Sequence, residues 1–284
     1  MSVPPSVPPP VSVPPSAPAP ATGVAPPPES LPERLLRVYA RLLEAYGPQG
    51  WWPGGGDPFE VIVGAVLTQS VSWTNVELAL ENLRSAGALS LPGVHALDDA
   101  TLAALIRPSG YYTVKARRLR AVVRLVCDGF GGDLTRLLGL PLDVLRPRLL
   151  ATHGIGQETA DAILVYAAGQ PSFVVDAYAL RLFGRLGLTP PGGLTHRYGP
   201  WRDHLMAHLP ADATLFNEYH ALIVRHGKER CRKRAPRCPA GQRSRRGQSG
   251  QRGARLRQRS VPWRTIRAWY SLNRVASAGR WAIR

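Results

Sequence analysis

An apolar helix end, a tight glycine turn and a second helix start follow one another between residues 149 and 164 of this 284-residue chain. The turn is Gly154-Ile155-Gly156. Glycines at both turn positions carry no side chain, so the backbone N–H groups can approach an anion closely. The helix that follows presents its positive N-terminus to the same anion. The segment therefore predicts two helices joined by a hairpin that binds a phosphate.

Helical patterns recur along the rest of the chain. Residues 30–33, Ser-Leu-Pro-Glu, form a capping box, and apolar residues then follow at helical spacing up to Gly47. A second start signal opens at Asp57, with proline at the first helical position. Further helical patterns occupy 74–86, 98–106, 114–128, 142–151, 157–168, 176–187, 198–207 and 211–226. No segment alternates apolar and polar residues for long enough to require a sheet, so the predicted fold class is all-α.

The N-terminal segment 1–30 contains 12 prolines, spread among serine, valine and alanine. It cannot sustain helical hydrogen bonding and has little to bury, so it is predicted to be extended and disordered. It lacks the charged start and apolar stretch of a secretory signal, and no later segment has the roughly 18 uninterrupted apolar residues that a membrane span needs. We therefore expect a soluble, cytoplasmic protein.

The net charge of +17 is concentrated at the C-terminal end. Of the 36 basic residues, 16 lie in 231–284, which has no Asp or Glu. The remaining 20 are nearly balanced by the 19 acidic residues of the chain. The segment 231–284 is therefore predicted to be a disordered basic tail. Such a tail favours a nucleic acid or another polyanion as partner, and a merely solubilising tail is the alternative.

Two carboxylates follow the glycine turn. Glu158 lies in the first turn of the second helix, and Asp176 comes 18 residues later, after an apolar run and before a helix start. Together with the turn, this spacing resembles the helix-hairpin-helix and downstream aspartate of the endonuclease III (HhH-GPD) superfamily of DNA glycosylases. The resemblance implies two helical lobes with a DNA cleft between them. Residues 31–56 with 171–230 would form one lobe, and 57–170 a six-helix lobe with the helix-hairpin-helix at 145–168.

The resemblance also implies roles for the two carboxylates. In this family the position of Glu158 carries a lysine whose amine attacks the sugar and permits strand cleavage. A carboxylate cannot form that Schiff base, so we expect base removal without lyase activity. The matching aspartate of the family stabilises the cationic sugar or activates water, which assigns catalysis to Asp176. The plainer readings are a glutamate favoured by the helix dipole and a helix N-cap aspartate.

Adjacent tryptophans precede a run of three glycines at 54–56. On a flexible loop, Trp51 and Trp52 could stack on an extruded base, and a role in the core or between lobes is the alternative. Over about 50–228 the chain is similar to the 3-methyladenine glycosylase branch of the endonuclease III family, which lacks the lysine and uses tryptophan in its base pocket. The motifs that carry this similarity include Trp51-Trp52-Pro53, 64–69, 107–112, Gly154-Ile155-Gly156 with Glu158, and 174–176. The predicted base pocket comprises Trp51, Trp52, Pro53, Tyr111 and Tyr112.

The predicted DNA contacts gather around the hairpin. They comprise Gly154, Ile155, Gly156, Thr159 and Gln69. Gln69 ends an apolar helix, and the matching glutamine of the family fills the hole left by the flipped base; a polar helix end is the alternative. The basic residues Lys115, Arg117, Arg118 and Arg120 could touch phosphates, but the simpler prediction for them is a solvated helix face.

Cys231 and Cys238 match the first half of the family's iron–sulfur motif, Cys-x6-Cys-x2-Cys-x5-Cys. The third and fourth positions fall on Gly241 and Gly247. Two thiolates do not hold a four-iron cluster, which needs four ligands, so we expect no cofactor. The composition changes abruptly after Ala240, which indicates either a reading-frame shift near that residue or a natural tail in place of the cluster loop.

The sequence thus predicts a monomeric base-excision DNA glycosylase. It would flip a damaged base out of double-stranded DNA and hydrolyse its N-glycosidic bond with Asp176, acting on alkylated purines. One alternative is an endonuclease III-type glycosylase and lyase for oxidised pyrimidines. An alternative of another class is a non-catalytic helix-hairpin-helix DNA-binding protein. The predicted partner is double-stranded DNA that contains a damaged base or an abasic site.

Overall fold

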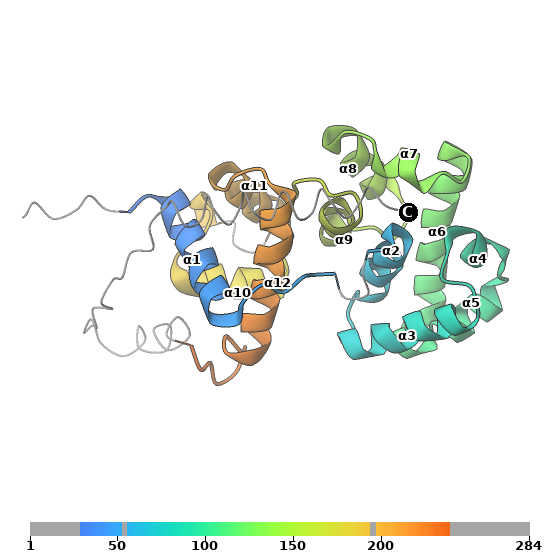
Figure 1. Cartoon of the computed structure of the whole chain (residues 1–284), viewed down its shortest axis with the longest axis horizontal. Helices are drawn as coiled ribbons and strands as arrows, with labels where there is room; N and C mark the ends of the chain where they lie inside the picture. Colours follow the sequence, from blue (N-terminus) through green and yellow to red (C-terminus); the bar gives the residue numbers. More distant parts are fainter. Residues whose placement is uncertain (1–28, 53–55, 194–196, 239–284) are drawn as a thin grey trace, which may run out of the picture.

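The structure is a computed structural model that describes residues 29–52, 56–193 and 197–238. These residues form two helical lobes that lie side by side (Figure 1) and contain no strand. The predicted all-α fold is therefore confirmed for the part of the chain that the structure describes. The proline-rich segment up to residue 28, the residue Pro53 and the basic tail from 239 onward lie outside the described residues.

The first lobe is built from helices between residues 58 and 167. It contains α2 (Pro58–Leu67), α3 (Trp73–Ser85), α4 (Leu91–Ala96), α5 (Asp99–Leu105), α6 (Tyr112–Phe130), α7 (Leu134–Leu138), α8 (Leu142–Ala151) and α9 (Gln157–Ala162), with a short 3-10 turn η1 (Arg107–Ser109). These helices share one hydrophobic core around the helix α2, of which eight of ten residues are buried. Asp57 starts that helix by accepting hydrogen bonds from the N–H groups of Phe59 and Glu60.

The second lobe joins the two ends of the described chain. It contains α1 (Leu31–Tyr46), α10 (Ala177–Leu186), α11 (Tyr198–His208) and α12 (Ala213–Glu229), with a short turn η3 (Pro191–Gly193). Its own core includes Phe173 and Trp201, and it also buries Cys231 and Cys238. The packed part of this lobe therefore extends to residue 238, beyond the boundary at 230 that the sequence suggested.

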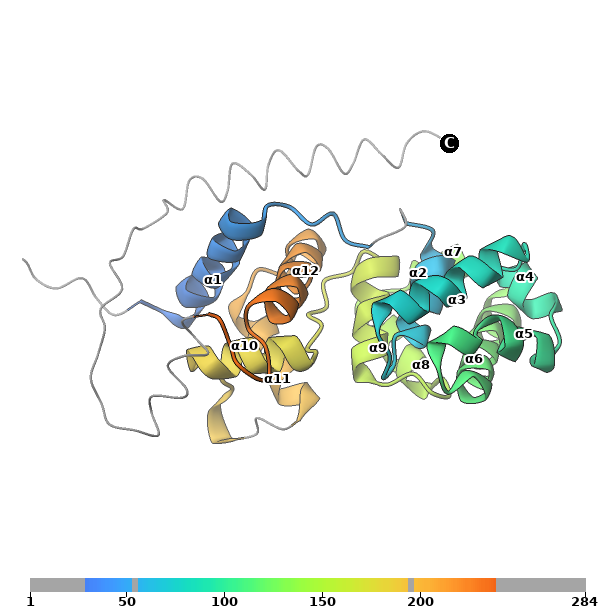
Figure 2. The same cartoon turned by 90° about the horizontal axis from the view of Figure 1, so that it is seen from below.

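The chain passes between the lobes twice, from α1 to α2 and from α9 to α10 (Figure 2). At the second passage α9 continues into a π-helical turn, η2 (Ile163–Ala167). Ile163 and Leu164 belong to the core of the first lobe, whereas Val165 belongs to the core of the second. The wider π turn thus carries consecutive side chains into two different cores.

The sequence patterns located the longer helices to within a few residues, but they missed two short ones. Those are α4 and α7, of six and five residues. A helix of one to two turns shows too little periodicity to be recognised, although Ser90 and Asp133 both cap by accepting backbone hydrogen bonds. Among the described residues, no helix combines the length and the apolar character that crossing a membrane requires.

Candidate active site

Asp176 begins α10 as its N-cap. Its Oδ1 accepts hydrogen bonds from the N–H groups of Tyr178 at 2.9 Å and Ala179 at 2.7 Å. Both bonds go to one oxygen, which leaves Oδ2 for another partner. The side chain is 13% exposed. The capping role and a chemical role are therefore compatible, because each can use a different oxygen of the carboxylate.

His220 of α12 faces that second oxygen. Its Nε2 lies 3.5 Å from Oδ2 of Asp176, which is long for a hydrogen bond but close for a charge interaction. On the opposite side of the ring, Nδ1 is hydrogen-bonded to the hydroxyl of Tyr166. Tyr166 comes from η2, so one residue from the inter-lobe turn and two from the second lobe form the line Tyr166–His220–Asp176.

The surrounding protein shifts the pKa values of Asp176 and Glu158 in opposite directions. Burial raises the pKa of Asp176, but the proximity and charge of His220 and the hydrogen bonds from two backbone N–H groups outweigh it, and the net pKa is lowered. Glu158 has a raised pKa because neighbouring protein removes part of its solvation and the charge of Asp176 opposes ionisation. Glu158 itself remains accessible to solvent at the start of α9. Asp176 therefore has the lower pKa of the two carboxylates and ionises first as the pH rises.

Four aromatic side chains form a group at the Tyr166 end of this line. Trp52 contacts the rings of Trp51, Trp73 and Tyr166, with centroid separations of 5.7, 5.0 and 5.5 Å. Trp51 also lies 5.9 Å from Trp73. We call Trp51, Trp52, Trp73 and Tyr166 the aromatic cluster. Through Tyr166 the cluster adjoins His220, whose ring centroid is 5.9 Å away.

The two adjacent tryptophans belong to neither hydrophobic core. Their indole Nε1 atoms are buried and have no hydrogen-bond partner among the described residues. Trp52 packs so closely against α2 that a methyl group added at Gly64 would lie 2.5 Å from its Cζ2 atom. The absence of a side chain at Gly64 therefore allows the indole of Trp52 to pack against α2. The N–H groups of both indoles remain available as hydrogen-bond donors.

The predicted hairpin connects α8 to α9 as expected. Gly154 has a φ of +82°, a conformation that favours glycine, and Ile155 is buried in the core of the first lobe. Gly156 is exposed and caps α9 in an extended conformation. The turn is thus anchored in the core by Ile155, and Gly156 is the glycine of the turn that is exposed.

Gln69 is hydrogen-bonded to the hairpin and to the helix that follows it. Its Nε2 donates to the carbonyl of Gly154 at 3.1 Å and to the hydroxyl of Thr159 at 2.9 Å. Its Oε1 accepts a hydrogen bond from Arg118, whose side chain covers Gly154 so closely that no Cβ would fit there. Gln69, Gly154, Thr159 and Arg118 therefore form one connected group at the surface of the hairpin.

The basic residues of α6 do not form the solvated helix face that the sequence suggested. Lys115 is buried, with Nζ donating to the carbonyls of Leu67 and Ser109. Burial, with a smaller effect from Arg118, lowers its pKa to about 8. Arg120 pairs with Asp99, and of these four residues only Arg117 is exposed. The prediction was wrong because Lys115 satisfies helix-terminal carbonyls that the sequence pattern does not identify.

The two tyrosines assigned to the base pocket lie at the N-terminus of α6. Tyr111 is 74% exposed and has a φ of +48°, and Tyr112 is 37% exposed. No ring contact joins them to the aromatic cluster among the described residues. Their role in a base pocket stays a prediction, and the structure places them on the surface of the first lobe.

A buried ion network joins the lobes beneath the hairpin. Asp161 of α9 is completely buried and accepts two hydrogen bonds from Arg146 of α8, at 2.8 and 3.1 Å. Arg202 of α11 and Ser172 approach the same carboxylate at 3.1 and 2.6 Å. The network therefore ties the helix-hairpin-helix to a helix of the second lobe, and with it to the lobe that carries Asp176.

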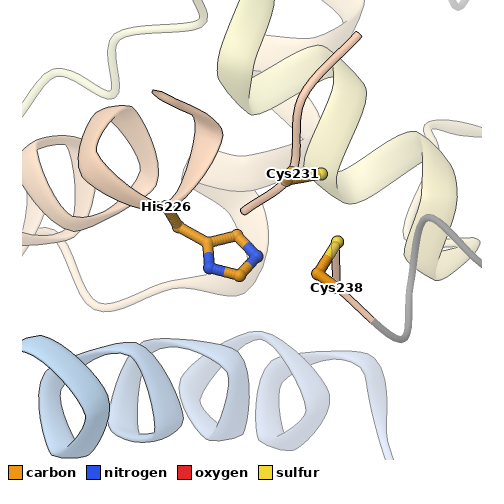
Figure 3. A group of neighbouring side chains, drawn as sticks. All are labelled: His226, Cys231 and Cys238. Carbon is orange, nitrogen blue, oxygen red and sulfur yellow. The ribbon is translucent and has the colours of Figure 1, made fainter. Parts of the chain in front are cut away.

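Cys231 and Cys238 are brought together at the end of α12, where His226 joins them (Figure 3). This group lies on the second lobe and contains no member of the aromatic cluster. The chain has three cysteines in all, and Cys127 lies in α6 of the first lobe beside His95. The residues present therefore do not fit a four-iron cluster held by four cysteines.

Several residues of the site carried no recognisable sequence signal. His220, Tyr166 and Trp73 lie on helices as single polar or aromatic positions, and such residues are most often part of a core. Arg118 was considered as a surface residue and instead supports Gln69 and Gly154. Only the packing of α12 against η2 and α10 shows that His220 lies between Tyr166 and Asp176.

Known proteins share both the sequence pattern and the fold. The HhH-GPD superfamily of base excision DNA repair proteins matches residues 63–196. Over 205 residues, 72% of this chain and 91% of the relative, the sequence is 42% identical to MJ1434 of Methanocaldococcus jannaschii, a candidate DNA repair glycosylase.

Two solved structures extend the comparison. The Helicobacter pylori 3-methyladenine DNA glycosylase bound to 1,N6-ethenoadenine superimposes with a TM-score of 0.56 at 28% identity, over 71% of this chain and 98% of that one. Endonuclease III in a non-covalent DNA complex superimposes with a TM-score of 0.63 at 20% identity, over 76% and 98%. The second likeness concerns the fold alone.

Proposed function

The chain belongs to the HhH-GPD superfamily of base excision DNA repair proteins, and from this premise we propose that it is a monofunctional DNA glycosylase for alkylated purines. The observation that carries the proposal is the placement of Asp176 beside His220 at the edge of the aromatic cluster. In this proposal the cluster receives the extruded base, Asp176 acts at the sugar, and the hairpin holds the DNA backbone.

The line Tyr166–His220–Asp176 supports an ionised aspartate. Burial raises the pKa of Tyr166 well above its usual value, so its hydroxyl keeps its proton and can donate to Nδ1 of His220. On the other side of the ring, Nε2 of His220 lies 3.5 Å from Oδ2 of Asp176. The carboxylate would face the sugar as its glycosidic bond breaks, stabilising the positive charge on C1′ or taking a proton from the attacking water.

The aromatic cluster favours a purine that carries positive charge. Indole faces attract cations, and an alkylated purine with a quaternary ring nitrogen is already cationic and leaves without needing an acid. The unpartnered indole N–H groups of Trp51 and Trp52 offer donors to acceptor atoms on the base. The structural relative is a 3-methyladenine DNA glycosylase, which supports alkylated purines as the substrate class, although the 1,N6-ethenoadenine bound to it is a neutral base.

The hairpin is proposed to bind a phosphate of the DNA backbone. Gly156 is exposed, and α9 begins directly after it without a side-chain cap. The first N–H groups of the helix therefore lack side-chain partners and can bind an oxyanion. Gln69 and Arg118 hold the turn in the conformation that exposes them.

Strand cleavage is expected to need added alkali, because Glu158 provides no amine at the family's lysine position. Three labelled duplexes test this: one with 1,N6-ethenoadenine, one with an N-methylated purine and one with an oxidised pyrimidine. We expect alkali-dependent breaks in the second duplex, whose base is cationic, and no covalent adduct after borohydride reduction with any of the three. The enzyme without DNA and an undamaged duplex serve as controls.

Two other results would replace the proposal with its alternatives. An efficient borohydride adduct with the oxidised-pyrimidine duplex would identify an endonuclease III-type enzyme that uses another amine. Failure to release any base, with retained affinity for an abasic duplex, would identify a DNA-binding protein without catalysis.

Gly64→Ala is expected to slow base release without altering any residue of the aromatic cluster. The added methyl group would lie 2.5 Å from Trp52, so the indole must shift. Loss of one base-stacking contact is worth roughly 1–3 kcal/mol, or about tenfold or more in single-turnover rate. In a Trp52→Ala background, where the indole is absent, Gly64→Ala should have little further effect.

The same measurements separate a base pocket from a packing role for the tryptophans. If Trp51→Ala and Trp52→Ala only slow base release, their melting temperatures and abasic-site binding stay near those of the unmodified protein. If both residues pack the lobes together, each truncation costs roughly 3–5 kcal/mol of stability and abasic-site binding falls in step. That second outcome would remove the support for alkylated purines.

A further inference from the structure

Three metal-ligating side chains converge at the end of α12, away from the proposed active site. The ligand atoms of His226, Cys231 and Cys238 all lie within 4.8 Å of one another. Both cysteines are buried, at 0% and 3% exposure, and belong to the core of the second lobe. Figure 3 shows the imidazole directed at the space between the two sulfur atoms.

The local backbone builds this arrangement. The N–H groups of Arg230 and Cys231 both bond to the carbonyl of His226, at 2.9 and 2.8 Å, so the helix end curls back over its last turn. The N–H of Arg237 then bonds to the carbonyl of Arg230 at 2.9 Å and closes the loop between the cysteines. Cys231 and Cys238 are thereby returned to the same side of the chain as His226.

Neighbouring groups orient the ligands as they do in metal sites. The hydroxyl of Tyr46 lies 2.9 Å from Nδ1 of His226, which leaves Nε2 as the ring nitrogen available toward the sulfurs. A hydrogen bond on the other nitrogen is the usual way in which a metal-ligating histidine is fixed. The guanidinium of Arg185 lies 3.1 Å from Sγ of Cys231 and places a positive charge beside this ligand atom.

From these contacts we propose that His226, Cys231 and Cys238 bind a single zinc ion in place of the iron–sulfur cluster. One nitrogen and two thiolate ligands suit zinc, whose tetrahedral sites place ligand atoms roughly 3.5–3.8 Å apart. The present separations, all within 4.8 Å, need to shorten by no more than about 1.3 Å to reach that geometry. Two thiolates also neutralise the charge of Zn²⁺, which suits a buried position.

In this proposal a water molecule occupies the fourth coordination position of the zinc ion. Residues 239–284 contain no Cys, His, Asp or Glu, so the remainder of the chain supplies no further ligand of the usual types. The ion would join α12 to the loop at 231–238 and, through Tyr46, to α1. Because these groups come together only in the folded lobe, zinc binding would stabilise the second lobe directly.

Metal analysis of the full-length, untagged protein tests the site without measuring glycosylase activity. Purified under reducing conditions and dialysed, the protein should retain one zinc ion per chain. Cobalt substitution should give the visible absorption of a tetrahedral cobalt–thiolate site. His226→Ala and Cys238→Ser should both lose stoichiometric zinc, whereas the matched control Cys127→Ser should keep it. Tyr46→Phe should weaken zinc binding by about 10–100-fold, because the imidazole loses its orienting partner.

A measurement on the unmodified protein tests the zinc site even if the variants fail to fold. A chelator should lower its melting temperature, and added zinc should restore it. The proposal is overturned by zinc retention no greater than in a Cys231→Ser, Cys238→Ser double variant. It is equally overturned by stoichiometric iron and sulfide, or by a Cys231–Cys238 disulfide that persists in place of the metal under reducing conditions.

Discussion

Asp176→Asn is expected to slow base release by about 10²–10⁴-fold, the usual contribution of a positioned acid–base group. The variant should fold, because asparagine caps a helix about as well as aspartate and can still accept from Tyr178 and Ala179. It loses the negative charge that faces His220 and, in the proposed mechanism, the sugar. Single-turnover release from an alkylated duplex measures the effect, and affinity for an abasic duplex should stay nearly unchanged.

Asp212→Asn provides the matched control. Asp212 caps α12 in the same way, accepting from the N–H groups of Thr214 and Leu215 at 2.8 and 3.0 Å. Any cost of exchanging a capping aspartate therefore appears in both variants. Rates for Asp176→Asn equal to those of the control would refute the assignment of catalysis to Asp176.

Asp161→Asn is expected to destabilise the protein by roughly 3–5 kcal/mol, the range observed when one partner of a buried ion pair is removed. The neutral amide of this variant would leave the charges of Arg146 and Arg202 without their shared carboxylate. Because the network joins α8 and α9 to α11, the loss should loosen the second lobe against the hairpin. Denaturant unfolding followed by circular dichroism measures the change in unfolding free energy.

Asp203→Asn is a control that removes an exposed carboxylate, rather than a buried one, from the side of Arg202. Asp203 also pairs with Arg202, at 3.3 Å, but its side chain is 75% exposed. An exposed pair contributes at most about 1 kcal/mol, so this variant should unfold close to the unmodified protein. Equal stability of the Asp161 and Asp203 variants would show that the buried network contributes no more than a surface ion pair.

The helices of this protein were predictable because their signals are local. Capping residues such as Asp57 and Asp176, the glycines of the hairpin and the apolar spacing of α1 and α12 act within a few residues of one another. The hairpin was predictable for the same reason, because its signal is the adjacent residues Gly154, Ile155 and Gly156. It failed for α4 and α7, which are too short to show a period and depend on packing in the first lobe.

The candidate site was only partly predictable, because local sequence signals do not reveal contacts between residues far apart in the chain. Asp176, Glu158 and the tryptophan pair stood out through their neighbours in sequence or through a family resemblance. His220, Tyr166 and Trp73 have no such neighbours, because their partners lie 44, 54 and 21 residues away. Likewise, Lys115 and Asp161 could equally have been surface charges until their helices were packed.

The sequence by itself determined the helical class, the glycine hairpin between two helices and the absence of a lysine at position 158. These follow from backbone conformation and residue chemistry at fixed local spacing. Only the tertiary structure decided that His220 meets Asp176, that Trp52 rests on Gly64, and that His226 joins the two cysteines. Those contacts arise where helices from distant parts of the chain pack together, and packing depends on the shape of both partners rather than on the sequence around either one.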